Sequence, residues 1–188
     1  MDWYAKVEKF VSAAFLKSSN AGDMKHFERT VFWLKELKPD ADEAMLIAAF
    51  AHDIERAFRN ERTYNKITGS DKGFTSQAHL QYHQETGAKI ISDFLTAQHA
   101  PPDLVSKVSN LISKHEVGGT EEENILKDAD SISYFETQID MFLKDKVKSA
   151  GEEKVRVKFE WMFNRITSPK AKTLAEPMYK SAIKRLIK

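Results

Sequence analysis

Apolar residues recur at three- and four-residue steps along nearly the whole chain, and this spacing constrains the fold more than any other feature. The first stretch shows the pattern in Trp3, Val7, Phe10, Val11, Ala14 and Phe15. Such spacing places one apolar face on an α-helix. The 188 residues include only seven Gly and five Pro, and no stretch alternates as a strand does. The sequence therefore predicts a single all-α domain over residues 1–188, a bundle of about seven to eight helices.

Capping and breaker residues locate several helix ends. Asp40 followed by Glu43 resembles a capping box and predicts a helix that runs to about residue 58. Residues 60–75 hold two Gly and many polar residues, so we expect a long loop there. A last helical stretch begins at Ser168, and we expect an interruption at Pro177 because proline removes a helical hydrogen bond.

The composition excludes several classes of protein. Mean hydropathy is −0.50, and no apolar run approaches the roughly 20 residues of a membrane span. The absence of Cys excludes disulfides, iron–sulfur clusters and thiolate nucleophiles. The first ten residues, MDWYAKVEKF, lack the basic-then-apolar order of a signal peptide. We therefore expect a cytoplasmic protein with no membrane partner.

Charge is distributed unevenly along the chain. Residues 1–143 hold 16 Lys and Arg against 23 Asp and Glu, whereas residues 144–188 hold 13 against 5. The C-terminal part is therefore basic and the body acidic. We expect the basic residues to form a solvated helical face. A surface for an anionic substrate or a nucleic acid is the alternative.

Aromatic residues gather near both ends of the chain: Trp3, Tyr4, Phe159, Trp161 and Phe163. We expect most of them to pack in the core, because large aromatic side chains are mostly buried. A homodimer face is the alternative use of the same residues.

Histidine and aspartate side chains carry the chemistry of this sequence. His52 and Asp53 follow the small apolar run 48–51, so they should be at least partly buried. A buried carboxylate is costly unless it is paired or binds a cation. Imidazole and carboxylate together form the ligand set of Zn, Fe, Mn or Co sites. Ligands from separate helices can converge in the core of a bundle.

Four short segments follow one another in a recognisable order. They are Asp23-Met-Lys-His26-Phe-Glu-Arg29, Ala48-Ala-Phe-Ala-His52-Asp53-Ile54, His83-Gln-Glu-Thr-Gly87-Ala88 and Leu126-Lys-Asp-Ala-Asp130. In combination they resemble the HD superfamily of metal-dependent phosphohydrolases. The resemblance implies an α-helical metal-site core at about 23–135, followed by the basic helical part 144–188. The Gly-Tyr-Pro segment of superfamily members that hydrolyse cyclic dinucleotides is absent.

The resemblance implies that His26, His52, Asp53 and Asp130 bind a divalent transition metal. Mn, Fe, Co, Ni and Zn all suit such ligands, and Mg is a further option. Asp130 is chosen over Asp128 because it matches the Ala-Asp pattern of the superfamily. Residues two apart on a helix point to different faces, so Asp128 is expected to face solvent.

The number of metals stays open at this stage. Binuclear members of the superfamily add two histidines, and His83 and His115 stand where those would lie; Asp53 would then bridge the two metals. In mononuclear members comparable histidines contact phosphate or support the ligands. His79 shares a helix face with His83 and is a further candidate for phosphate contact, with a surface position as the alternative.

Charged residues near the motifs are candidates for catalysis. Arg29 lies one turn after the first histidine ligand and could hold a phosphate bidentately, with a structural ion pair as the alternative. Glu55 is a candidate general base or water-orienting group, with an exposed helix-end charge as the alternative. Lys66, Lys72 and Lys114 are weaker candidates for phosphate contact.

The resemblance implies hydrolysis of a small phosphorylated substrate, such as a nucleotide, by metal-activated water. Two other classes remain open. One is a ligand-binding or regulatory module that keeps the fold without turnover. The other is a di-iron oxygenase of the same superfamily, which needs both His83 and His115 as iron ligands.

Overall fold

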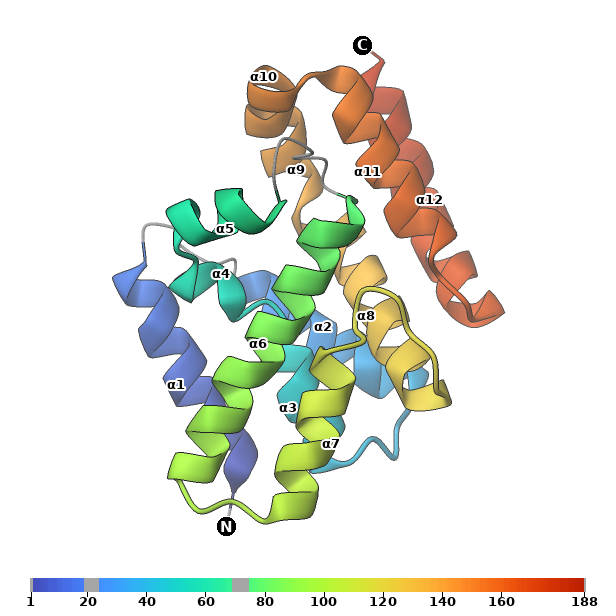
Figure 1. Cartoon of the computed structure of the whole chain (residues 1–188). Helices are drawn as coiled ribbons and strands as arrows, with labels where there is room; N and C mark the ends of the chain where they lie inside the picture. Colours follow the sequence, from blue (N-terminus) through green and yellow to red (C-terminus); the bar gives the residue numbers. More distant parts are fainter. Residues whose placement is uncertain (1, 19–23, 69–74, 188) are drawn as a thin grey trace.

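The computed structural model describes residues 2–18, 24–68 and 75–187, and helices account for most of them (Figure 1). No strand occurs in these ranges, which confirms the all-α expectation. Nor does any helix within them have the length and apolar character needed to cross a membrane. In chain order the elements are α1 (Trp3–Lys17), α2 (Met24–Leu37), α3 (Glu43–Ala51), α4 (Glu55–Phe58), α5 (Glu61–Thr68), α6 (Gln77–Ala97), α7 (Pro102–Ile112), α8 (Glu121–Thr137), α9 (Ile139–Met141), the π-helical turn η1 (Phe142–Lys146), α10 (Val147–Ala150), α11 (Glu152–Asn164) and α12 (Pro169–Leu186).

Two hydrophobic cores meet along α8. Its first half contributes Leu126 and Ala129 to a core formed with α1, α2, α3, α6 and α7. Its second half contributes Ile132 and Phe135 to a core formed with α11 and α12, which lie side by side in Figure 1. Helix α8 therefore connects the helices that carry the histidine motifs with the basic C-terminal helices.

Two aromatic residues near the ends of the chain are buried, as expected. Trp3 belongs to the first core and Phe159 to the second. The homodimer alternative for the remaining aromatic residues stays a prediction.

The start of α3 differs from the expected capping box. The carboxylate of Asp42, not that of Asp40, accepts a hydrogen bond from the Met45 N–H group at 3.0 Å. Glu43 has a different partner, because its carboxylate accepts the first two N–H groups of α1 at 2.6 and 3.0 Å. These N–H groups have no partner within their own helix, so Glu43 fixes α1 against α3.

The expected loop at 60–75 was wrong in its first half, where α5 forms. The Asn60 side chain accepts a hydrogen bond from the Thr63 N–H group at 3.0 Å and so caps the helix in this polar stretch. Residues 69–74 lie outside the described residues, as does Asp23. The helix expected to run to residue 58 is also divided, because a turn at 52–54 separates α3 from α4.

Helix α12 continues through Pro177, so the expected interruption there was wrong. Pro177 lies on the exposed side, where water can bind the carbonyl group that the proline leaves unpaired. On the opposite side Ala175 and Ala182 are buried in the second core. This packing holds the helix together across the proline.

Gly87 lets α6 approach the turn that carries the His-Asp pair. A Cβ atom at this position would lie 3.3 Å from the His52 carbonyl oxygen and 3.5 Å from a methyl group of Ile112. The missing side chain therefore allows close contact, which brings His83, one turn earlier on α6, to Asp53.

Candidate metal centre and active site

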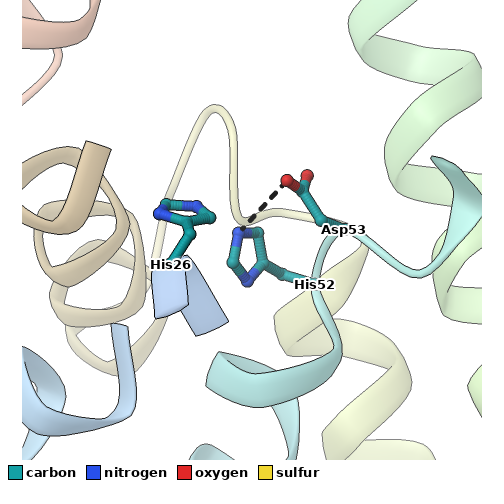
Figure 2. Close-up of side chains that lie close together, drawn as sticks. All are labelled: His26, His52 and Asp53. Carbon is teal, nitrogen blue, oxygen red and sulfur yellow. Dashed lines mark ion pairs between the residues drawn. The ribbon is translucent and has the colours of Figure 1, made fainter. Parts of the chain in front are cut away.

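His52 and Asp53 lie at the centre of a buried polar cluster, with His26 beside them (Figure 2). The Nδ1–H group of His52 donates to the Ala49 carbonyl oxygen at 2.9 Å. Its Nε2 atom therefore points inward, 3.9 Å from the nearer Asp53 oxygen and 3.4 Å from Asp130 Oδ1. Burial lowers the pKa of His52, but these two carboxylates outweigh it and raise the pKa to about 9. The two carboxylates near His52 Nε2 thus favour a positive charge at this position.

His26 and Asp130 come together from α2 and α8. His26 Nε2 lies 3.1 Å from Asp130 Oδ1. The Ser133 hydroxyl donates to the His26 carbonyl oxygen at 2.8 Å and accepts the Nδ1–H group of the same residue at 2.9 Å. A hydrogen bond at Nδ1 leaves Nε2 as the ligand atom. The structure therefore brings together all four residues of the expected metal set.

A second buried group shares Asp53 with the first. Ligand atoms of Asp53, His83 and His115 lie within 4.8 Å of one another, as do those of His26, His52 and Asp53. The Nδ1–H group of His115 donates to the Ile112 carbonyl oxygen at 2.7 Å. His83 Nε2 lies 2.9 Å from Asp53 Oδ1. Asp53 therefore belongs to both groups of potential metal ligands.

Two imidazole nitrogens at this centre have no hydrogen-bond partner. His52 Nε2 and His115 Nε2 are buried, and within the described ranges no donor or acceptor bonds to either. Leaving a buried polar atom unsatisfied costs about 1–3 kcal/mol. Burial also lowers the pKa of His115 to about 4, so this imidazole is neutral at neutral pH and can act as a ligand. The buried His and Asp residues can therefore hold a metal ion.

Glu55 is hydrogen-bonded to His83 and does not lie exposed at a helix end. It is fully buried and accepts the Nδ1–H group of His83 at 2.9 Å. Arg59 donates to both oxygens of the same carboxylate, at 2.8 and 2.6 Å. Burial raises the pKa of Glu55, but the hydrogen bonds from Arg59 and His83 outweigh it and hold the pKa at about 2. The carboxylate thus fixes the ring of a candidate ligand.

Three other candidates take positions that the sequence left open or misplaced. Arg29 is engaged by Glu136, to which its Nε–H group donates at 2.7 Å in a partly exposed pair. His79 is half-buried, and its Nδ1 atom forms a 2.8 Å hydrogen bond with the Tyr64 hydroxyl. Asp128 was expected to face solvent but is buried. Its two oxygens accept the N–H groups of residues 167 and 168, both at 2.8 Å.

Sequence reasoning missed a buried ion-pair network behind the metal set. Arg165, at the end of α11, donates to Asp130 and Glu116, and its Nε–H group donates to Ser131 Oγ at 2.8 Å. All three charged side chains are at least nine-tenths buried. Burial raises the pKa of Asp130, but Arg165 and the neighbouring histidines outweigh it and hold the pKa well below the usual range. The C-terminal helices therefore take part in building the site.

A cavity of about 30 Å³ adjoins the cluster, with His26, Asp53 and Asp130 in its wall. Tyr134 and Lys158 also line it, and the sequence analysis singled out neither of them. Two of the three lysines that were candidates for phosphate contact lie elsewhere. Lys66 and Lys114 are exposed, and Lys72 lies outside the described residues.

Comparison with known proteins agrees with this architecture. None of the curated proteins is detectably similar to the chain. Among solved structures, the chain resembles the crystal structure of a predicted HD superfamily hydrolase from an uncultured Thermotogales bacterium. The two are 23% identical, with a TM-score of 0.56, over 96% of this chain and 87% of the other. This likeness confirms the HD-domain fold.

A family model described as "Domain of unknown function (DUF4202)" matches residues 12–187. This range includes the histidine motifs, α8 and the C-terminal helices that supply Arg165 and Lys158. Because the match covers nearly the whole length, the chain belongs to the DUF4202 family.

Proposed function

We propose that the protein is a metal-dependent phosphohydrolase that acts on a nucleotide or a related small phosphate compound. The observation that carries this proposal is the pair of buried ligand groups that share Asp53, each with an imidazole nitrogen that no hydrogen bond satisfies. Two divalent transition metals suit these groups. His26, His52, Asp53 and Asp130 would hold one, and Asp53, His83 and His115 the other.

When bound, such cations activate water and polarise a phosphoryl oxygen. The chain's own residues set up that chemistry. Glu55 and Arg59 hold His83 in place, and Arg165 holds Asp130. The sequence suggested Arg29, Asp53 and Glu55 as catalytic residues, and of these only Asp53 is among the proposed metal ligands. Glu55 is a positioning residue, and we leave Arg29 out of the catalytic set because it pairs with Glu136 instead.

The test is phosphate release from a panel of nucleotides and other phosphoesters, with each candidate metal supplied in turn. His52→Ala and Asp53→Ala should abolish release while the helical circular dichroism signal stays largely intact. His99→Asn is the matched control, because His99 is exposed and has φ of 61°, a conformation that Asn tolerates. Full activity in either site variant refutes the assignment.

The second ligand group is also what a di-iron oxygenase needs, so that alternative is tested alongside. It requires oxygen consumption that depends on iron, with polyols or phosphonates as substrates. A ligand-binding module without turnover would show binding of nucleotides or phosphoesters but no product. The complete set of buried ligands favours an enzyme over such a module.

A further inference from the structure

The cavity beside the candidate metal centre lies between the helices that carry the histidine motifs and the C-terminal helices. Asp53 and Asp130 border it from the metal centre, and Tyr134, Phe142 and Lys158 border it from α8, η1 and α11. Its volume is about 30 Å³. One water molecule needs roughly 10–15 Å³ of such volume, so the cavity accepts a group the size of a few water molecules.

Lys158 brings a buried positive charge to this cavity without a direct ion pair of its own among the residues that the structure describes, because Glu116, which also lines the cavity, is paired with Arg165. Its side chain is 7% exposed, and its Nζ atom lies 4.5 Å from the centre of the Trp161 ring. Within the described ranges, no carboxylate oxygen lies within 4.0 Å of Nζ, whereas Arg56 pairs with Asp53 at 3.2 Å. Arg165 is also paired, with two acidic residues. A buried charge is costly unless something compensates it, so Lys158 is suited to an anionic ligand.

Tyr134 adds an unused hydrogen-bond donor. The residue is 5% exposed, and its hydroxyl group is buried with no hydrogen-bond partner in the described part of the chain. Buried tyrosine hydroxyls normally have a partner. Together Tyr134 and Lys158 present a donor and a cation to the same small space, next to the candidate metal ligands.

We propose that this cavity is the subsite for the terminal phosphoryl group of a phosphomonoester, held by Lys158 and the Tyr134 hydroxyl. The inference rests on the proposed function and names its substrate class. A terminal phosphoryl group is small, and its negative charge and acceptor oxygens match Lys158 and the Tyr134 hydroxyl. The carboxylates of the lining have other partners, because Glu116 pairs with Arg165 and the proposed metals would compensate Asp53 and Asp130. A diester carries substituents on two of its oxygens, so we expect it to fit this small cavity less well.

Binding of inorganic phosphate to the full chain, measured by calorimetry on the protein as purified and after loading with Mn²⁺, tests the subsite directly. Tyr134→Phe and Lys158→Gln should each weaken binding about 10-fold or more, because a hydrogen bond to a charged group is worth about 1.5–3 kcal/mol. Tyr179→Phe, on α12, and Lys154→Gln, at an exposed position one turn earlier on α11, are the matched controls. Tyr134→Phe removes a hydroxyl without a protein partner, so the thermal stability of this variant should not fall. A loss of phosphate affinity in it then cannot be attributed to unfolding. Wild-type phosphate affinity in Tyr134→Phe and Lys158→Gln overturns the inference.

Kinetics separate this inference from the proposed function. With para-nitrophenyl phosphate and bis(para-nitrophenyl) phosphate as probes, we expect faster hydrolysis of the monoester and a higher KM for it in Tyr134→Phe. Faster hydrolysis of the diester overturns the substrate class. If the wild type hydrolyses phosphoesters but neither variant changes KM or phosphate affinity, the subsite is wrong and the hydrolase stands. If phosphate binds and the variants weaken it but nothing is hydrolysed, the subsite stands and the hydrolase is wrong.

Discussion

Replacing Arg165 with Met removes the guanidinium that lies between two buried carboxylates, those of Asp130 and Glu116. The side chains of all three are between 5% and 7% exposed. Removing one partner of a buried ion pair typically costs about 3–5 kcal/mol, because the remaining charge is left uncompensated. We therefore expect the metal-free Arg165→Met chain to lose about 3–5 kcal/mol in free energy of unfolding. Saturating Mn²⁺ should recover part of this loss, since a cation compensates Asp130.

Urea unfolding followed by circular dichroism, with chelator and with Mn²⁺, measures both effects. Arg29→Met is the matched control, because its pair with Glu136 is 28–29% exposed and such pairs contribute only about 0–1 kcal/mol. Adding Glu116→Gln to Arg165→Met should restore some stability by removing one stranded charge. If Arg165→Met costs no more than Arg29→Met, the buried network does not stabilise the site and the reasoning fails.

Three further predictions concern the helices around the site. Glu55→Gln should lower metal affinity about 10–100-fold, the usual effect of losing a group that orients a ligand; metal titration checks it, with the exposed Glu61→Gln as control. Gly87→Val should cost about 1–3 kcal/mol in urea unfolding, because its Cβ would lie 3.3 Å from the His52 carbonyl oxygen, and wild-type stability would contradict the close packing of α6. Burial raises the pKa of Asp42, but hydrogen bonds from Lys107 and the Met45 N–H group outweigh it, so the pKa lies below 3.8. The lowered pKa stabilises the chain above pH 3.8, and this effect is lost as the pH falls. Asp42→Asn, which keeps a capping oxygen, should therefore be less stable than the wild type by at most about 1 kcal/mol near pH 6 and equally stable in acid. A difference in stability that persists in acid would contradict this.

The clustering of the four proposed ligands could be predicted from the sequence because these residues belong to motifs whose order was recognisable. His26, His52, Asp53 and Asp130 come from three separate segments, and the structure brings them together. Asp42 shows the limit of local reasoning. The spacing of Asp40 and Glu43 fits a capping box, but Glu43 accepts the first two N–H groups of α1 instead and Asp42 caps α3.

The residues that reach the site from α11 could not be predicted in the same way. Arg165 lies 35 positions after Asp130 and 49 after Glu116, so only the docking of α11 against α8 brings them together. A weak signal existed for Lys158. It shares a helix face with Val155 and Met162, both of which are buried. A lysine within an apolar face is a candidate for a buried charge, and the sequence reasoning treated it as part of a solvated surface.

Metal content per chain tests the central claim most directly. Elemental mass spectrometry on protein purified without chelator should find about two transition-metal ions per chain in the wild type, since two ligand groups share Asp53. His83→Ala should retain about one, and Asp53→Ala should lose both. No metal in the wild type, even after incubation with Mn, Fe, Co, Ni or Zn, would contradict the account.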